Sequence, residues 1–275
     1  MSNIQIVTDS TAYMLREQAI EKEIEIVPLS VYFNGTVTNE GFPGEFNDFF
    51  EALMTSKDFP TTSQPSAEAF KSVYEKALAC DKEVIVIVIS SKLSGTYNSA
   101  SVAAKMVDEN RISVIDSETT ASNLRILVER AKELSEEGKP REEIVKIINE
   151  EKSRMSINLT VDTLDYLKKG GRLTDIQAFI GSILNIKPII ALVEGKLVPV
   201  GKARGKSKAI DMMVSNIPMD VKIISICQIS ALEEAEQIKH ILSSKFAHAH
   251  INIDDLGPVI GAHLGPKAIG ICFTW

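Results

Sequence analysis

Hydroxyl side chains follow several of the strands that the sequence predicts, at the positions where each strand ends. Asp9-Ser10-Thr11 comes after the first predicted strand, residues 91–96 come after a strongly apolar one, and Asp116-Ser117 comes after the next. In open α/β sheets the carboxyl ends of the strands form the ligand crevice. These side chains are therefore candidates for binding a polar group.

The most suggestive of these segments is Ser94-Gly95-Thr96, which opens a predicted helix. Free backbone N–H groups at a helix start, together with the Ser94 hydroxyl, can converge on an anion. Gly95 would let a ligand approach the backbone closely. Ordinary helix capping is the alternative interpretation of the same residues.

Two more segments have the same ambiguity. Residues 61–66 (Thr-Thr-Ser-Gln-Pro-Ser) contain Thr62, and they also contain a proline and a serine that start a helix well. Residues 261–266 place His263 between glycines, in a predicted loop that joins two strands. A lone histidine is usually structural, but this loop setting leaves a role in a site open.

Other motifs resemble known sites but lack their spacing. Residues 201–207 have three residues between their glycines, whereas a phosphate-binding P-loop has four. We interpret them as a solvated basic turn or, through Arg204, as a contact surface for an acidic or phosphorylated partner. His248-Ala249-His250 lacks further metal ligands, and neither a dinucleotide-binding glycine motif nor a serine-hydrolase elbow occurs. No metal and no cofactor are expected.

Composition and charge argue against other classes of function. The chain has 275 residues, of which 44% are hydrophobic and 24% charged, and its net charge is −7. This acidic balance argues against binding nucleic acid or resting on anionic lipid. No apolar run is long enough to span a bilayer, the first residues lack the features of a signal peptide, and the three cysteines lie far apart. We expect a cytoplasmic protein without stable membrane insertion.

The first half of the chain alternates strands and helices. Strands are predicted at residues 4–8, 24–33, 83–90 and 112–115, and Asn34-Gly35 is typical of a hairpin turn. Residues 84–89 are all aliphatic, which is typical of a central parallel strand buried on both faces. Amphipathic helices are predicted between the strands, and the first of them runs to about Ile20.

The second half has a different pattern, with a hairpin turn at Glu194-Gly195 and a helix marked by Ile176, Phe179, Ile180, Ile183 and Leu184. Strands are predicted at residues 156–161, 187–193, 197–200, 221–227, 249–253, 259–262 and 268–273. We therefore predict an α/β protein of two domains. Residues 1–154 would form a doubly wound parallel-sheet domain, and residues 155–275 a mixed-sheet α/β domain.

Five segments, taken in order, resemble one known family. They are Thr8-Asp9-Ser10-Thr11-Ala12, Thr62-Ser63-Gln64-Pro65-Ser66, residues 91–100 (Ser-Lys-Leu-Ser-Gly-Thr-Tyr-Asn-Ser-Ala), residues 164–172 (Leu-Asp-Tyr-Leu-Lys-Lys-Gly-Gly-Arg) and residues 261–266 (Gly-Ala-His-Leu-Gly-Pro). With them the chain closely resembles, over nearly its whole length, the DegV family of bacterial fatty-acid-binding proteins. The Leu-Ser-Gly-Thr and Lys-Gly-Gly-Arg segments are the most specific.

The resemblance implies a long-chain fatty acid enclosed at the junction of two α/β domains, with no catalytic chemistry in this chain. It implies that Thr62, Ser94 and His263 hold the carboxyl group, to which backbone N–H groups near Gly95 can be added. Members of the family serve as the acyl-binding subunit of bacterial fatty acid kinase, whose kinase subunit phosphorylates the bound carboxyl group for phospholipid synthesis. Arg172, on a tight turn expected to project its side chain outward, is the residue that the family associates with kinase engagement.

Two rival functions stay open, and the sequence departs from the family in places. The rivals are an esterase of the same fold that uses Ser94 and His263, and a regulatory module that senses a small apolar ligand. The departures are Lys267 in place of a frequent glycine, Ser122-Asn123-Leu124 in a usually glycine-rich segment, and Tyr13-Met14 in the first motif. Because lysine tolerates positive φ poorly, we expect another loop shape at Lys267. The preferred acyl chain stays open.

Overall fold

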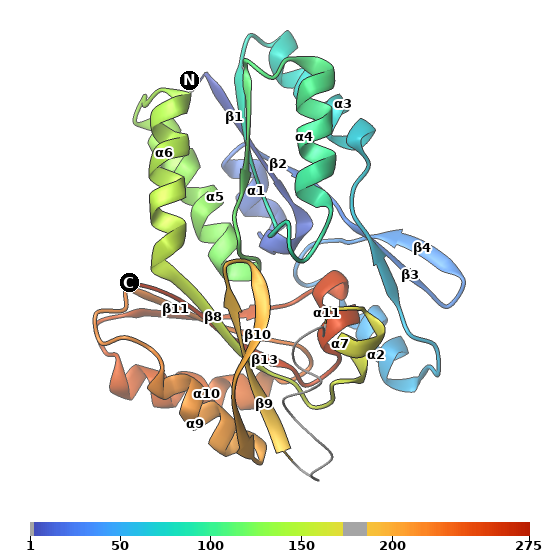
Figure 1. The fold of residues 1–275 in the computed structure, drawn as a ribbon, viewed down its shortest axis with the longest axis vertical. Coiled ribbons are helices and arrows are strands. Elements are labelled where there is room, and N and C mark those ends of the chain that lie inside the picture. Colours follow the sequence, from blue (N-terminus) through green and yellow to red (C-terminus); the bar gives the residue numbers. More distant parts are fainter. Residues whose placement is uncertain (1–2, 173–185) are drawn as a thin grey trace.

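The computed structural model describes residues 3–172 and 186–275, which form two α/β halves and a small third sheet. Figure 1 shows the first sheet with its helices at the top and the second sheet with its helices at the bottom. The predicted α/β class, with a parallel sheet in the first half and a mixed sheet in the second, is confirmed.

The first sheet has four parallel strands in the order β2-β1-β6-β7. The strands are β1 (Ile4–Asp9), β2 (Ile24–Val27), β6 (Glu83–Val88) and β7 (Ile112–Asp116). Ile85 and Ile87 pack on one face of β6, and the three valines of the strand pack on the other. The prediction of a central parallel strand buried on both faces is therefore confirmed.

Four helices cover the two faces of this sheet, as a doubly wound fold requires. They are α3 (Ala67–Ala79), α4 (Thr96–Val107), α5 (Ala121–Glu136) and α6 (Arg141–Glu151). Side chains of α3 and α4 share a hydrophobic core with Val86, whereas those of α5 and α6 share another core with Ile85. The alternation along β6 thus gives each pair of helices its own core.

The first helix differs from its prediction. A 3-10 turn at Ser10–Ala12 and a separate helix α1 (Arg16–Glu21) replace one helix running to about Ile20. Tyr13 lies between them with a φ of 48°, in the left-handed region that cannot continue a right-handed helix. This break turns the Tyr13 side chain into the protein, where it is buried.

The third sheet was not predicted, and it explains why residues 24–33 are not one strand. Its strands are β3 (Ser30–Phe33), β4 (Thr36–Asn39) and β5 (Thr61–Ser63), in the order β4-β3-β5. The chain leaves the first sheet at Pro28, which lacks the N–H that a ladder needs. Asn34-Gly35 forms the predicted hairpin turn, with φ values of 47° and 79°. Helix α2 (Asn47–Thr55) follows this hairpin.

The second sheet has six strands in the order β10-β9-β8-β13-β11-β12. They are β8 (Met155–Thr160), β9 (Ile186–Val193), β10 (Lys196–Arg204), β11 (Ile223–Gln228), β12 (His250–Asp255) and β13 (Ile269–Thr274). All neighbours are antiparallel except β11 and β12. Since β8 begins this sheet, we propose the boundary between the domains directly before it, after residue 154.

Helices α9 (Lys206–Ser215) and α10 (Leu232–Lys245) cover one face of the second sheet, at the bottom of Figure 1. The short helices α7 (Asp165–Lys169) and α11 (Pro258–Leu264) lie toward the first half. Residues 259–262, predicted as a strand, belong to α11, because Pro258 occupies the first turn, where its fixed φ favours a helix. The sequence did not predict α9, and the helix marked by Ile176 and Phe179 falls outside the described residues.

The loop after α11 also differs from expectation. Lys267 adopts a φ of 60°, the conformation that lysine tolerates poorly. Its backbone N–H donates to the Ile229 carbonyl at 2.8 Å, and its carbonyl accepts from Lys206 Nζ at 2.6 Å. These bonds on both sides hold the residue in that conformation. Along the described parts of the chain, none of the helices combines the length and the apolar character needed to cross a membrane.

Candidate functional site

The two halves meet on a shared hydrophobic core. Tyr13, Phe50 and Ala121 from the first half belong to the same buried cluster as Leu159 and Leu192 from the second. The face of the second sheet that α9 and α10 leave uncovered is thus closed by the first half. A cavity in this region is bounded by both halves of the chain.

One such cavity, of about 80 Å³, lies at this junction. Most of its walls are aliphatic, including Leu29, Ile89, Leu93, Leu159, Leu167 and Ile260. Its polar lining consists of Thr62, Ser94, Thr120, Arg172 and His263. The structure therefore brings three of the predicted ligand-binding residues, and one predicted partner-binding residue, to a single cavity.

Thr62 and His263 are in direct contact across this cavity. Thr62 Oγ1 and His263 Nε2 lie 2.8 Å apart, although the two residues are 201 positions apart in the sequence. Thr62 is held by the pairing of β5 with β3, where it lies opposite Val31. His263 lies in the last turn of α11, and not in the loop that the sequence predicted. The contact joins the third sheet to the second half.

His263 is electrostatically unusual. Burial, and then the nearby Arg172 cation, lower the pKa of His263 from 6.5 to about 4. The imidazole is therefore neutral at pH 7 and carries one N–H. Its Nδ1 atom is buried and has no hydrogen-bond partner among the described residues, which is uncommon for a buried polar atom.

The Gly-Gly-Arg turn is shaped around this histidine. A Cβ atom on Gly170 would lie only 2.1 Å from His263 Nδ1, so no larger residue fits there without a shift. Gly171 has a φ of 72°, which favours glycine. The two glycines therefore serve different purposes, one for close approach to His263 and one for the turn itself.

Arg172 does not project outward as predicted. Its Nε and Nη2 atoms donate to the Leu93 carbonyl at 3.2 and 3.1 Å, and Nη1 donates to the Gly170 carbonyl at 2.5 Å. Because the turn folds the side chain back over the mouth of the cavity, the guanidinium is half-buried, and this burial lowers its pKa. Among the described residues no carboxylate pairs with it.

Ser94 and Gly95 lie close together but face different spaces. Ser94 lines the cavity, and its Oγ atom lies 2.8 Å from Thr96 Oγ1 at the start of α4. Gly95 lines a neighbouring crevice, and a Cβ atom there would lie 2.5 Å from the Gln64 side chain. The absence of a side chain at Gly95 thus accommodates Gln64. Ligand approach to its backbone stays a prediction.

The geometry at Ser94 and His263 bears on the esterase alternative. Each side chain has its own hydrogen-bond partner, Thr96 for the serine and Thr62 for the histidine. Among the described residues, no carboxylate orients His263 from Nδ1. A serine nucleophile needs a base within reach and a third group that orients the base. The contacts of Ser94 with Thr96 and of His263 with Thr62 do not form such a triad of nucleophile, base and orienting group.

Arg204 lies far from the cavity. It is the exposed last residue of β10, roughly 23 Å along the strand from the cavity residue Leu197 at about 3.3 Å per residue. The neighbouring Lys206 is paired with Glu234, so the predicted basic turn is partly neutralised. No group of side chains that could hold a metal ion occurs within residues 3–172 and 186–275.

A second polar cluster, which was not predicted from the sequence, lies at the other end of α11. Glu40 is buried, and its carboxylate accepts from the Val259 backbone N–H at 2.7 Å, Ser10 Oγ at 2.6 Å and Tyr13 Oη at 3.2 Å. Burial raises the pKa of Glu40 from 4.5 to about 7. The neighbours Thr38 and Asn39 are exposed and polar, so no local pattern reveals that Glu40 faces inward.

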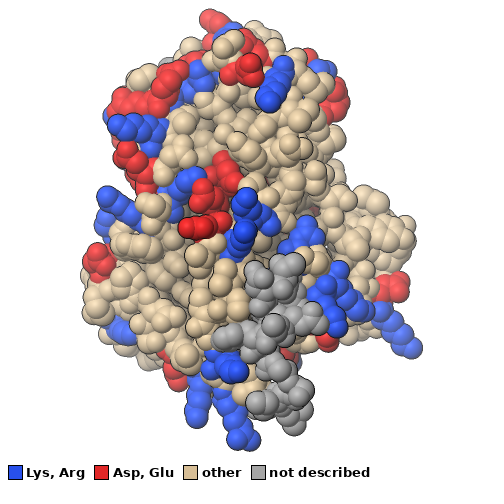
Figure 2. Space-filling model, in the orientation of Figure 1, with Lys and Arg blue, Asp and Glu red and all other residues tan. Residues whose placement is uncertain are grey.

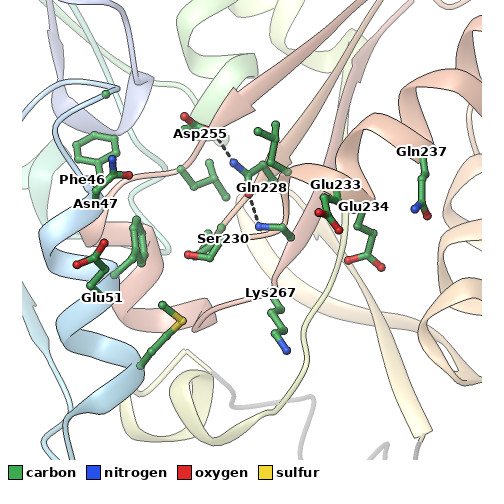
Figure 3. Close-up of a pocket in the computed structure, with 17 residues that line it drawn as sticks. Phe46, Asn47, Glu51, Gln228, Ser230, Glu233, Glu234, Gln237, Asp255 and Lys267 are labelled. Carbon is green, nitrogen blue, oxygen red and sulfur yellow. Dashed lines mark hydrogen bonds between the residues drawn. The ribbon is translucent and has the colours of Figure 1, made fainter.

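A larger hollow lies elsewhere on the protein. Figure 3 shows this groove of about 790 Å³, between Phe46, Asn47 and Glu51 of the first half and the start of α10. Gln228 also lines it and donates to the Asp255 carboxylate. The groove shares no lining residue with the junction cavity and contains none of the predicted site residues. Size alone therefore does not identify the site.

Comparison with known proteins places the chain among its relatives. A family model described as "uncharacterised protein, DegV family" matches residues 3–274. Protein DegV from Bacillus subtilis is 35% identical over 282 residues, which cover 99% of this chain and 99% of that protein. The match therefore includes both halves and the junction between them.

Solved structures are similar over the same extent. The crystal structure of DegV, a fatty acid binding protein from Bacillus subtilis, has a TM-score of 0.90 at 35% identity and covers 100% of both chains. The structure of a DegV family protein from Thermus thermophilus, also described for fatty acid binding, has a TM-score of 0.87 at 32% identity. It covers 98% of this chain and 99% of that chain.

Proposed function

This chain belongs to the DegV family, and we propose that it binds a long-chain fatty acid in the junction cavity. The observation that carries the proposal is the contact between Thr62 and His263, which places polar groups from both halves at one end of an apolar space. Relatives that match over the full length and bind fatty acids support the same site.

The hydrocarbon chain supplies the affinity. An acid of about 16 carbons has about 14 methylenes, and burying them contributes roughly 11 kcal/mol at about 0.8 kcal/mol each. Association and ordering subtract several kcal/mol from this gain. The cavity of about 80 Å³ is smaller than the roughly 300–1,000 Å³ of typical ligand pockets. The aliphatic walls must therefore separate when the acyl chain enters.

The carboxyl group supplies orientation. A buried carboxylate is unfavourable unless it is hydrogen-bonded, and the hydroxyls of Thr62 and Ser94 and one N–H of His263 can provide such bonds. Rotation of the Thr62 hydroxyl toward the ligand would break its present contact with the histidine, which would free Nε2 for the same carboxylate. None of these groups is arranged as a nucleophile with its base, so we propose binding without turnover.

We further propose that the chain presents the carboxyl group to a fatty acid kinase subunit, which would make the acyl phosphate. Arg172 supports this, because its half-buried guanidinium lies between the head-group residues and the surface. Arg204 would belong to the same docking surface only if the partner extends roughly 23 Å along β10. A regulatory sensor of small apolar ligands is the remaining alternative.

Mass spectrometry of the purified protein after denaturing extraction tests the binding proposal. We expect about one fatty acid per chain, because release would expose the acyl chain to water. Ser94→Ala and Thr62→Ala should each weaken palmitate binding by about 1.5–3 kcal/mol without unfolding the protein. Protein that yields no lipid and does not bind added palmitate or oleate would sink the proposal. Turnover of activated acyl esters would favour the esterase.

A paired assay tests the role of Arg172. A fluorescent fatty acid titration measures binding, and a reaction with the cognate kinase and ATP measures acyl phosphate. We expect Arg172→Ala to reduce product sharply while binding changes little, and Arg172→Lys to recover little, because lysine lacks the planar fork. Arg204→Ala removes the same charge at the other predicted partner residue, and it reports whether that residue belongs to the docking surface. Equal loss of binding and product would assign Arg172 to the cavity alone.

A further inference from the structure

A second hollow adjoins the junction cavity on its outer side. This crevice of about 390 Å³ is bounded by residues 91–95, by Gly171-Arg172 and by Lys196-Leu197. Leu93, Ser94, Arg172 and Leu197 line both spaces. Whatever extends from the proposed head-group position past Ser94 and Arg172 therefore enters the crevice.

The crevice is cationic in a protein whose net charge is −7. Three of its nine described lining residues are Lys92, Arg172 and Lys196, and none of the nine is acidic. No ion pair within the described parts of the chain involves any of these three residues. Arg172 bonds only to backbone carbonyls, which do not neutralise its charge. On the face drawn in Figure 2, basic side chains gather near the middle, with acidic ones close beside them.

One buried serine holds the two lysine-bearing loops together. Ser90 Oγ donates to the Gly195 carbonyl at 2.8 Å and accepts from the Lys92 backbone N–H at 3.2 Å. A Cβ atom on Gly195 would lie 2.3 Å from Ser90 Oγ, and the φ of Gly195 is 78°. The hairpin of the second half therefore docks closely on the first half, which fixes Lys196 beside Lys92. The positive charge is thus built into the junction.

We propose that this crevice binds the phosphoryl group of an acyl phosphate while the acyl chain stays in the junction cavity. The inference rests on the proposed kinase partnership. In that reaction a carboxylate oxygen attacks the terminal phosphorus of the kinase's nucleoside triphosphate. The bond from that phosphorus to the bridging oxygen breaks, and the nucleoside diphosphate leaves with its electron pair. The head group is then larger and carries about one more negative charge.

The junction cavity is unsuited to that added charge. Its histidine is neutral near pH 7, since burial and Arg172 lower the pKa of His263 to about 4. Among the described residues that line the cavity, Arg172 is the only cation, and it faces the crevice as well. Three of its five guanidinium N–H groups bond to backbone carbonyls, and the other two have no partner among the described residues. A phosphoryl group that leaves the cavity toward Lys92 and Lys196 would meet these donors and both ammonium groups.

The test compares two ligands of equal chain length. Palmitate probes the cavity alone, and (2-oxoheptadecyl)phosphonate, in which a methylene replaces the labile anhydride oxygen, probes the cavity and the crevice together. Each displaces a fluorescent fatty acid from the protein. We expect Lys92→Ala/Lys196→Ala to weaken the phosphonate by about tenfold or more, and palmitate by less than about twofold. Added salt should weaken the phosphonate more than palmitate, because the phosphonate carries more charge and meets more cations.

The matched control is Lys105→Ala/Lys146→Ala, which removes the same charge from exposed positions on α4 and α6. Its two affinities should stay at the wild-type values. The proposal is overturned if the Lys92/Lys196 variant binds the phosphonate normally, or if it loses both ligands equally. If the wild-type protein binds neither ligand, the fatty acid function itself fails, which is a different result.

Discussion

An ionisable side chain lies at each end of α11, the buried Glu40 at one end and the partly buried His263 at the other, and the surroundings of the two differ. At the first end, the carboxylate of Glu40 accepts three hydrogen bonds, from Ser10, Tyr13 and Val259. At the other end, His263 has one partner, Thr62, and its Nδ1 atom has none among the described residues. One short helix therefore joins a polar cluster whose acceptor has all its hydrogen bonds to one in which a buried nitrogen atom has no hydrogen-bond partner among the described residues.

Burial moves both groups toward their neutral forms, raising the pKa of Glu40 to about 7 and lowering that of His263 to about 4. The two groups differ in the hydrogen bonds that offset their loss of contact with water. Donors of the fold itself compensate Glu40, so its role is to hold α11 against the first half. Nothing comparable compensates His263, and buried polar groups are normally satisfied. A ligand carboxylate at Nε2, the atom that now contacts Thr62, would supply a charged acceptor at that end.

The largest effect is expected from Glu40→Ala. The substitution leaves two hydroxyls and one backbone N–H without their buried acceptor, and each unsatisfied donor costs about 1–3 kcal/mol. We expect the free energy of unfolding to fall by about 3 kcal/mol or more, measured by urea denaturation. Glu25→Ala, at an exposed position of β2, should change little. A loss below about 1 kcal/mol at Glu40 would show that this end of α11 is not the anchor.

The free energy of unfolding should fall with rising pH because the pKa of Glu40 is raised in the folded protein. Its pKa is about 7 in the folded protein and 4.5 in the reference state, so the folded protein binds the extra proton between these values. Stability from this group is complete below about pH 4.5 and is lost as the pH rises to about 7, by about 3 kcal/mol in all. Glu40→Gln removes this loss. Its unfolding free energy relative to wild type should therefore rise from pH 4.5 to 8, and a flat difference would contradict the assignment.

Much of the fold follows from local pattern. The unbroken aliphatic run in β6 could only be satisfied between two layers, and Asn34-Gly35 could only be a tight turn. The predictions were wrong where residues outside a segment determine its secondary structure. Residues 259–262 are as apolar as a strand, but Pro258 and the Glu40 carboxylate fix their first turn as helix. The prediction of one strand at residues 24–33 is wrong because the chain passes from the first sheet to the third sheet at Pro28.

The candidate site was predicted less from local pattern than from resemblance. Nothing near Thr62 indicates that it contacts a histidine in the other half, because that contact depends on how two sheets pack. The direction of Arg172 was predicted wrongly for a similar reason, since the acceptor that holds it is the Leu93 carbonyl of a distant loop. Glu40 was missed entirely, because its burial depends on α11 packing against the hairpin of the third sheet.

The smallest expected effect concerns the end of α11 at which His263 lies. If the ligand carboxylate binds beside His263, its negative charge should raise the pKa of His263 above the ligand-free value of about 4. Binding then takes up protons at pH values between the two, so palmitate affinity should increase as the pH falls toward 6. One linked proton limits the slope to at most about tenfold, or about 1.4 kcal/mol, per pH unit. Fluorescence titrations of wild type and His263→Gln at several pH values measure this slope.

The ionisation of the acid itself affects both proteins alike, so the difference between their slopes gives the contribution of His263. A fatty alcohol of equal length should show no slope. If both proteins respond to pH identically, the carboxyl group does not lie beside His263, and the two ends of α11 do not differ in the way described above.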